Sequence, residues 1–334
     1  MATTVASLNL WSILSESKRI INAHSRHFLA LSVIFLLPLS FSLIVSPTIL
    51  HLLIHSNSPT IHILLRLPQT QTQAQAQFKA QTNSLNFPFP FPLLLLLSLF
   101  LLFIFSLSAL ATITHSVFHG FFGRPVKLFS AVTSLISSFL PLLVTTILSH
   151  LILFSLSIPI PLLSFLLGPS LSLSPIILTA SAILLLALIF FIFYLRVSWT
   201  LASVIAVVEN NYGIQSLCRS AALMNGMKST GASCFLFFAS LEGIMLWSGS
   251  LLAAVGSDSG SWRDWAIVVQ IVLTSTVMTV LMLYNAAANT VLYMYCKAVH
   301  GELASEIVEE SAWQYVSLPF DDGKIPHVVS VVSV

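Results

Sequence analysis

A single carboxylate stands in the middle of an apolar stretch of the chain: Glu242, between Phe235–Leu241 and Ile244. An acidic side chain at the centre of a bilayer costs about 2.5–3.5 kcal/mol, so it normally faces the inside of a helix bundle or a wet cavity. There it can handle protons or cations, or it can stay protonated and hydrogen-bond to a neighbouring helix. One isolated carboxylate favours the second, packing interpretation and leaves the first open.

Two amides in the last apolar stretch are candidate partners of this carboxylate. Asn285 and Asn289 are four residues apart and therefore lie on one face of a helix, on either side of Ala286–Ala288. The stretches that hold Glu242 and the amides are consecutive, so they run antiparallel and can be neighbours. We interpret the amides first as packing groups, each interhelical hydrogen bond contributing about 0.6 kcal/mol. The alternative is that Glu242, Asn285 and Asn289 together line an intramembrane polar site.

Histidine pairs at helical spacing could ligate a metal, as they do in membrane di-iron hydroxylases and desaturases. The chain has three such pairs: His24 and His27, His51 and His55, and His115 and His119. The distribution of basic residues places the middle pair on the opposite side of the membrane from the other two, and no two histidines are adjacent in sequence. We therefore predict no metal and no cofactor. Motifs of serine hydrolases, P-loop proteins and dinucleotide-binding folds are also absent from the sequence, and we predict that the protein is not an enzyme.

The composition indicates that lipid is the solvent of this protein. Hydrophobic residues make up 57% of the 334 positions and charged residues 7%, with a mean hydropathy of +0.96. Soluble domains carry about 25% charged residues, so 13 basic and 11 acidic residues cannot cover a globule of this size. A net charge of +2 without a basic run excludes nucleic acid as a partner. The bilayer itself is the expected partner.

Six segments are long and apolar enough to cross a bilayer as helices, since a crossing needs about 20 apolar residues. They span residues 28–53, 91–113, 129–157, 176–199, 232–255 and 265–296. Strands of a membrane barrel would alternate in polarity, and runs such as Leu93–Leu97 do not. The predicted fold is therefore an all-α integral membrane bundle of about six transmembrane helices, with Pro141 interrupting the third.

Three segments outside these crossings are predicted to be peripheral. Residues 1–27 form a leader with a short interfacial helix over Leu8–Ile21. Residues 54–90 contain the tract Gln69–Gln77 and are predicted to be a low-complexity, disordered loop. Residues 298–334 form an acidic tail, which we expect to be available to a cytoplasmic protein partner.

The region between the fourth and fifth crossings is predicted to be interfacial. Arg196 and Trp199 are of residue types found at membrane–water boundaries, so the fourth crossing should end near Trp199. Glu209–Gly213 predicts a turn, and an apolar stripe at helical spacing then begins at Ile214 and ends at Met224. This pattern predicts an amphipathic helix on the membrane surface or against the bundle. The candidate interfacial or partner-binding residues are Arg196, Trp199, Glu209, Arg219 and Lys228.

Basic residues decide the sidedness, because they are in excess on the cytoplasmic side of membrane proteins. With a cytoplasmic N-terminus, ten of the 13 Lys and Arg residues fall on the cytoplasmic side and three fall outside. Lys18, Arg19 and Arg26 directly precede the first crossing and weigh most. Both termini are therefore predicted to be cytoplasmic, in an endomembrane or in the plasma membrane.

Several sequence patterns resemble known families. The segment Trp199–Glu209, followed by Gly213-Ile214 and Arg219–Gly226, and the leader Trp11–Ser17 together resemble a family of uncharacterised plant membrane proteins with six spans. This likeness extends over nearly the whole chain and implies the same six-span fold, with no assigned activity. The pattern within Val207–Gly226 is also similar to the membrane domain attached to some bacterial glycerophosphodiester phosphodiesterases. Their catalytic barrel has no counterpart in this sequence, so the likeness implies no phosphodiesterase activity.

The leading functional hypothesis from the sequence is a non-enzymatic protein that organises the membrane or docks a partner through its cytoplasmic helix and acidic tail. A transporter or channel for a small solute or ion is the alternative, since Glu242, Asn285 and Asn289 place polar groups inside the membrane. A membrane metal enzyme built on the histidine pairs is the remote alternative.

Overall fold

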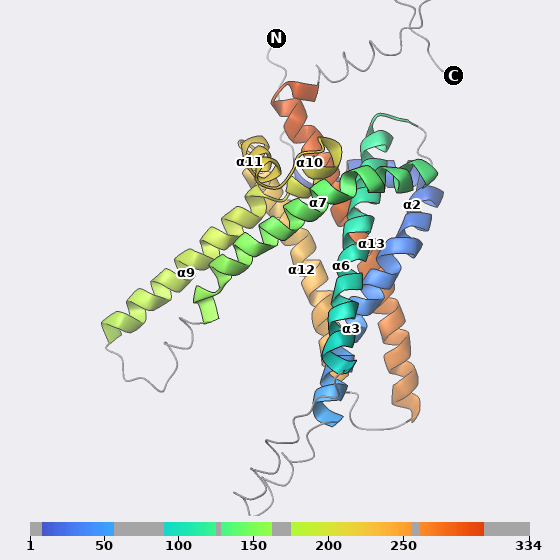
Figure 1. Ribbon diagram of the computed structural model, residues 1–334, viewed down its shortest axis with the longest axis vertical. Coiled ribbons are helices and arrows are strands. Elements are labelled where there is room, and N and C mark those ends of the chain that lie inside the picture. The colour runs from blue at the N-terminus through green and yellow to red at the C-terminus, as the bar shows by residue number, and fades with distance from the viewer. Residues whose placement is uncertain (1–8, 57–89, 125–127, 162–174, 256–260, 304–334) are drawn as a thin grey trace, which may run out of the picture.

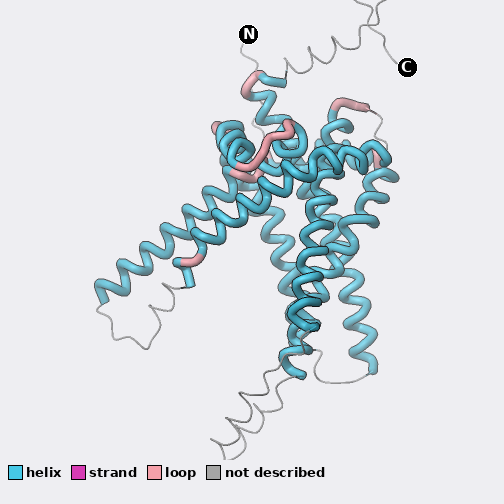
Figure 2. The backbone as a smooth tube through the Cα atoms, in the orientation of Figure 1, coloured by secondary structure: helices cyan, strands magenta, loops and turns pink. Residues whose placement is uncertain are grey.

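The computed structural model describes residues 9–56, 90–124, 128–161, 175–255 and 261–303 of the chain. All regular structure in these residues is helical (Figures 1 and 2). Six helical segments are long and apolar enough to cross a membrane: Ser25–Ser46, Leu96–Phe121, Leu128–Pro161, Thr179–Val208, Lys228–Ser248 and Val268–Val299. The prediction of an all-α fold with six candidate spans is therefore confirmed. The predicted disordered loop and most of the acidic tail lie outside the described residues.

The described helices follow the predicted order, with extra elements at the ends of the spans. The first half contains α1 (Leu10–Ala23), α2 (Ser25–Leu31), the π-helical turn η1 (Ser32–Leu36), α3 (Leu37–Ser56), α6 (Pro90–Phe121) and α7 (Leu128–Ser157). The second half contains α9 (Pro175–Ser198), α10 (Ala202–Val208), α11 (Ile214–Leu223), α12 (Lys228–Val255) and α13 (Ser261–Val299). The first candidate span is thus one nearly continuous run through α2, η1 and α3.

Prolines set the starts of two long helices. α6 begins at Pro90 and α9 begins at Pro175, and the first helical position suits proline because its missing N–H would have no partner there. Pro141, in contrast, lies inside α7, which continues unbroken on both sides of it. The prediction that Pro141 interrupts the third span is therefore wrong. The residue is buried, so packing holds the helix together where one backbone hydrogen bond is lost.

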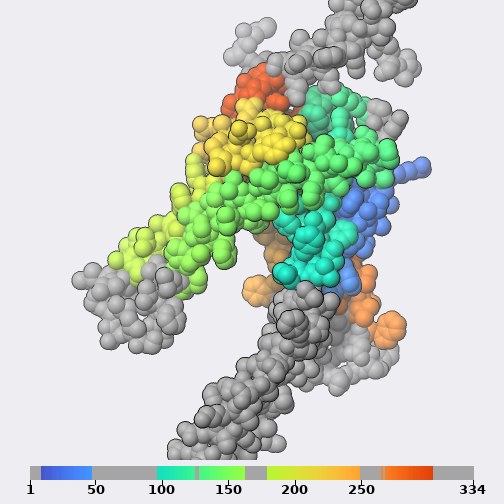
Figure 3. Space-filling model, in the orientation of Figure 1, coloured from blue at the N-terminus to red at the C-terminus, as the bar shows by residue number. Residues whose placement is uncertain are grey.

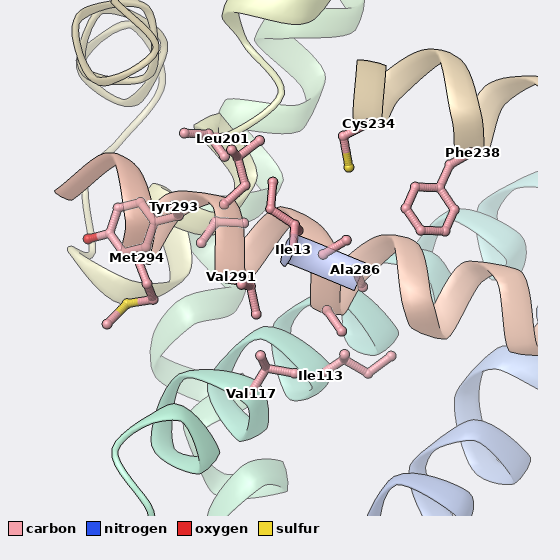
Figure 4. Close-up of a cluster of buried hydrophobic side chains, with 14 of the residues drawn as sticks. Ile13, Ile113, Val117, Leu201, Cys234, Phe238, Ala286, Val291, Tyr293 and Met294 are labelled. Atoms are coloured by element: carbon pink, nitrogen blue, oxygen red, sulfur yellow. The ribbon is translucent and has the colours of Figure 1, made fainter. Parts of the chain in front are cut away.

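The core of the bundle is arranged around α13. This helix packs against α1, α3, α6 and α12, and Figure 4 shows side chains of the neighbouring helices gathered along it. Ala286, Ala287 and Ala288 are buried on α13, and such small residues let neighbouring helices approach closely. Buried hydroxyls support the same contacts: Ser40 Oγ on α3 lies 2.7 Å from Thr279 Oγ1 on α13.

The hairpin formed by α7 and α9 stands apart from this core (Figure 1). Within the candidate span Thr179–Val208, which contains most of α9, 6% of an 18-residue apolar stretch is buried. The corresponding share for the span Val268–Val299 of α13 is 44%. α7 crosses α6 near the end of the bundle that carries α11 and the last turn of α13, and from there the two helices of the hairpin diverge from the rest of the bundle. Its exposed apolar side chains, such as Ile183 and Phe190, therefore face the surroundings of the protein and not its core.

We call the end of the bundle that carries α1, α10, α11 and the last turn of α13 the terminal end. α1 packs there with Ile13, Ser17, Ile20 and Ile21 buried, while Trp11 is 73% exposed. The leader therefore forms a helix with one buried face, and that face excludes Trp11. Among the described basic residues predicted to be cytoplasmic, Lys18 and Arg19 on α1 and Arg219 on α11 lie at this end, and its cytoplasmic location stays a prediction.

Candidate functional site

A cavity of about 280 Å³ lies where the α7–α9 hairpin joins the bundle. Residues of α6, α7, α9, α10, α12 and α13 line it, together with the turn that links α9 to α10. Binding sites for small molecules are typically about 300–1,000 Å³. The cavity lies just below this range, which suits a very small molecule or the polar headgroup of a larger one.

The bundle side of the cavity carries a chain of hydrogen bonds that ends at a carboxylate. Asn289 Nδ2 donates to Asn285 Oδ1 at 3.0 Å, and Asn285 Nδ2 donates to Glu242 Oε1 at 2.9 Å. Glu242 lies at the middle of α12 and both amides lie on α13. All three residues line the cavity. The structure thus brings together the three polar residues that the sequence singled out, and it gives them both a packing contact and an open space to face.

Helix α9 brings a cation to the cavity. Arg196 lines the cavity from the last turns of α9, and its guanidinium makes no hydrogen bond or ion pair with the residues that the structure describes. It forms no ion pair with Glu242 in particular, although both charges line one cavity. Because neither charge neutralises the other, a bound molecule with charged groups of its own could contact both.

Polar and aromatic groups complete the walls. His150 on α7 lines the cavity, and its Nδ1 lies 2.7 Å from the Thr146 carbonyl oxygen, so Nδ1–H donates there and Nε2 stays available. Phe235 and Phe238 precede Glu242 at helical spacing, on the face of α12 that lines the cavity. Trp199 follows Arg196 on the hairpin side. Each charged residue that lines the cavity thus has an aromatic residue within seven positions in sequence that lines it too.

A second ionic cluster lies at the terminal end, around Glu209. Tyr293 Oη donates to Glu209 Oε1 at 2.9 Å, and Asn211 Nδ2 donates to Oε2 at 3.0 Å. Arg219 Nε lies 3.4 Å from Oε2 and Lys297 Nζ lies 3.9 Å from Oε1. The carboxylate is thus held by α11, by α13 and by the turn after α10. We call these five residues the Glu209 cluster.

Arg219 extends this cluster to the last described turn of the chain. Its guanidinium donates to both carboxylate oxygens of Glu302, with one N–O distance of 3.1 Å. This hydrogen bonding raises the pKa of Arg219 and lowers the pKa of Glu302 below its usual range. The contact therefore ties α11 to the point where the acidic tail begins.

The turn between α10 and α11 connects the cluster to the cavity wall. Gly213 has φ +54°, a conformation that side chains other than glycine's rarely adopt. Its N–H donates to Thr145 Oγ1 at 2.9 Å, and Thr145 in turn donates to the Pro141 carbonyl oxygen at 2.8 Å. Because Thr145 lines the cavity, the turn is fixed directly to α7.

The five residues predicted as one interfacial segment fall into three places. Arg196 and Trp199 line the cavity, and Glu209 and Arg219 belong to the Glu209 cluster. Lys228 Nζ donates to Tyr194 Oη at 2.7 Å and lies 4.9 Å from the centre of that ring. Helix α9 ends at Ser198, next to Trp199, but the apolar candidate span continues to Val208, so an end of the crossing near Trp199 stays a prediction. α10, which follows it, is buried in the bundle.

The predicted amphipathic helix exists as α11, and its buried face matches the predicted stripe in part, since Leu217 and Met224 are buried. Ile214 is 64% exposed, whereas Ser216, Leu217, Ser220 and Leu223 are buried. Ser220 Oγ donates to the Ser198 carbonyl oxygen at 2.7 Å. Hydrogen-bonding serines, and not only apolar residues, therefore attach α11 to the bundle. A prediction of the buried face from hydrophobicity alone does not include these serines.

The histidine pairs do not assemble into a group that resembles a metal centre. Among the described residues, no three His, Cys, Asp or Glu side chains are placed to hold one ion. His115 Nε2 and His119 Nε2 lie 3.0 Å apart, and His27 Nε2 lies 2.9 Å from Ser116 Oγ. His51 and His55 lie in the part of α3 near the other end of the bundle, and their side chains are outside the described residues.

Sequence reasoning missed the contribution of α7 to the cavity. Thr145, Thr146, Ser149 and His150 all line it. The signal was present as polar residues at spacings of three and four within an otherwise apolar span. Ser and Thr are common in apolar helices because their hydroxyls bond to the preceding turn, so the pattern did not stand out.

Comparison with family models gave a match over residues 2–315 to the domain of unknown function DUF8558. No curated protein and no solved structure matches the chain. The match covers all of the described residues, so the cavity and the Glu209 cluster both lie inside the matched region.

Proposed function

We propose a function from the cavity itself, because the chain belongs to the DUF8558 family, a domain of unknown function. The protein resides in a membrane with both termini on the cytoplasmic side, and it binds a small charged molecule in the cavity, as a transporter does. One observation carries this proposal: Glu242 on α12 and Arg196 on α9 line the same cavity and do not pair with each other.

The cost of these charges supports a binding role. Charged residues make up only 7% of the chain, and placing a charge inside a bilayer costs about 2.5–3.5 kcal/mol. If packing were the only role of Glu242, Asn285 could bond to a neutral amide equally well. An open cavity beside the carboxylate favours a molecule that uses the charge. The same argument applies to Arg196, whose guanidinium makes no hydrogen bond or ion pair with the described residues.

This proposal reverses the order of the hypotheses drawn from the sequence. A membrane-organising or partner-docking role depended on an accessible amphipathic helix and on the acidic tail. The apolar and serine face of α11 is buried against the bundle, which leaves the tail as the remaining docking element. We keep docking through residues 304–334 as the second hypothesis, supported by the acidic character of that segment.

We propose no catalytic activity and no cofactor for the cavity. A relationship to plant six-span membrane proteins and to the membrane domain attached to bacterial glycerophosphodiester phosphodiesterases also stays a proposal. It is supported by the Val207–Gly226 pattern, which in this fold covers the end of α10, the turn and α11. Those residues hold the terminal end together, so the likeness concerns the fold and not a reaction.

Uptake into proteoliposomes tests the proposed function. The purified full chain is reconstituted and offered radiolabelled choline, phosphocholine, glycine betaine and phosphate in separate assays. We expect flux of at least one of the charged organic solutes, and we expect Glu242→Gln to abolish it. Glu16→Gln makes the same chemical change in an ion pair on α1, where Arg19 lies 2.6 Å away, and should leave flux intact. Absence of both binding and flux for every solute would contradict the proposal.

A further inference from the structure

The walls of the cavity differ in charge in a way that defines the class of ligand. Glu242 and the amides stand on the α12–α13 side, and Arg196 stands on the α9 side. A ligand that satisfies both sides must carry a positive group and a negative group at once. A simple cation or a simple anion would leave the other charge of the cavity unpaired, which is unfavourable for the half-buried Glu242. Arg196 is exposed and is therefore accessible to a ligand.

The neighbours of each charge refine this class. Phe235 and Phe238 line the cavity on the same helix face as Glu242, and aromatic rings beside a carboxylate are the usual surroundings of a quaternary ammonium group. Thr200 and Ser203 line the cavity beside Arg196, and hydroxyls beside a guanidinium suit a phosphate. The two halves together match a phosphate joined to an organic ammonium.

The position of the cavity indicates the direction from which such a ligand arrives. The surface is hollowed between the α7–α9 hairpin and α6 (Figure 3), and the cavity lies at the junction of the hairpin with the bundle. Leu107, Leu110 and Leu153 line it together with the polar groups. Beyond the cavity, α7 and α9 expose apolar side chains, among them Phe154 and Leu186. An apolar tail attached to the ligand would lie along this surface.

We propose, building on the binding role given above, that the ligand is a zwitterionic phospholipid that enters sideways from the bilayer between the α7–α9 hairpin and the bundle. Its ammonium group lies against Glu242, Phe235 and Phe238, and its phosphate lies against Arg196. Its acyl chains stay in the hollow between the hairpin and α6. The cavity volume of about 280 Å³ suits the headgroup and excludes the chains, which agrees with this placement.

Lipid retention by the purified protein tests this assignment. The full chain in detergent is mixed with equal amounts of dioleoyl phosphatidylcholine, dioleoyl phosphatidylglycerol and dioleoylglycerol, and the bound lipids are quantified by native mass spectrometry. Glycerophosphocholine, which carries the same headgroup without acyl chains, is titrated in a parallel assay. We expect phosphatidylcholine to be retained about tenfold over the other two lipids and to bind more tightly than glycerophosphocholine.

Variants on each wall show whether the cavity is the place of binding. Glu242→Gln and Arg196→Met should each lower retention of phosphatidylcholine about tenfold, because each removes one charge contact. Their matched controls are Glu16→Gln on α1 and Arg26→Met on α2, both outside the cavity, and these should retain the lipid as the wild type does. Equal retention by the cavity variants and their controls would overturn the assignment.

The free headgroup separates this inference from the proposed function. If glycerophosphocholine binds as tightly as the lipid and Glu242→Gln abolishes its binding, entry from the bilayer is wrong and the binding role of the cavity stands. If neither the lipid nor any of the charged solutes binds in a way that depends on Glu242 or Arg196, both proposals fail.

Discussion

Two glutamates, Glu209 and Glu242, occupy the same bundle in opposite ways. Glu209 accepts hydrogen bonds from Tyr293 and Asn211 and lies within 4 Å of two cations. Glu242 accepts one hydrogen bond, from Asn285, and faces a cavity. The first carboxylate is satisfied entirely by the protein, whereas the second keeps one oxygen without a protein partner among the described residues. We infer from this difference that Glu209 stabilises the fold and that Glu242 binds a ligand.

The same contrast applies to the two arginines. Arg219 is bonded to Glu302 and contacts Glu209, while Arg196 makes no side-chain bond within the described part of the chain. Structural charges are expected to raise stability, and charges kept for function to lower it or leave it unchanged. Stability measurements on matched variants therefore test the distinction between the two regions.

The largest effect is expected when the acceptor of the Glu209 cluster is removed. Glu209→Ala leaves Tyr293 Oη without its acceptor and two cations without their carboxylate, so the free energy of unfolding should fall by about 3 kcal/mol. Unfolding of the purified protein in mixed micelles by added SDS measures this change. Glu16→Ala is the control: Glu16 is about as buried as Glu209, but its one ion-pair partner, Arg19, is 76% exposed, so the loss should be clearly smaller. A Glu209→Ala variant as stable as that control would remove the basis of the comparison.

A smaller loss is expected from Tyr293→Phe, which deletes one hydrogen bond to the Glu209 carboxylate. Hydrogen bonds to charged groups contribute about 1.5–3 kcal/mol, and we expect the lower value because the ring keeps its packing. Tyr284 lies on the same helix, and its hydroxyl makes no hydrogen bond in the described structure. Tyr284→Phe should therefore leave the free energy of unfolding unchanged in the same SDS titration. A loss for Tyr284→Phe equal to that for Tyr293→Phe would contradict the assigned role of the hydroxyl.

The smallest stabilising effect is expected at Arg219 and Glu302, and it should depend on pH. The hydrogen bonds from Arg219 lower the pKa of Glu302 in the folded protein. The contact therefore contributes fully above the ordinary pKa of the carboxyl, about 4.5, and is lost as the pH falls through the lower folded value. Its magnitude should stay below about 1 kcal/mol, because a third of each side chain is exposed.

A comparison of melting temperatures between pH 7 and pH 3 measures this contribution. Glu302→Gln should lower the melting temperature of the protein slightly at pH 7, and the difference should be smaller at pH 3, because the contribution of the ion pair decreases as the pH falls below the ordinary pKa of the carboxyl. Equal differences between variant and wild type at both pH values would show that the ion pair is not the cause.

Most of the architecture could be predicted from the sequence, because one physical requirement determines it. A chain with 7% charged residues must place its apolar segments together or in lipid, and segments of 20 or more such residues form helices there. The ends of the helices were predicted where residue chemistry changes sharply, as at Arg196 and Trp199. Pro141 was misjudged because packing of a buried proline cannot be read from the residue type alone.

The candidate site could be predicted in part. Glu242 and the amides were found because polar residues are conspicuous in apolar helices, and their consecutive helices had to be neighbours. Arg196 was assigned to an interface and not to the same cavity, because the tilt of the α7–α9 hairpin is set by tertiary packing. His150 on α7 was missed for the same reason: the sequence does not state which face of an apolar helix meets the bundle.

The most direct test of the central claim is the melting temperature of the wild type and of Glu242→Gln in nanodiscs of dioleoyl phosphatidylglycerol, which lack a zwitterionic lipid, each with and without a zwitterionic headgroup ligand such as glycerophosphocholine. We predict that without ligand the variant melts no lower than the wild type, since the charge it loses has no protein cation as partner. With ligand, the wild type should melt at a higher temperature and the variant should not. A variant that is less stable without ligand, or that gains as much from the ligand as the wild type, would show that Glu242 serves packing and not binding.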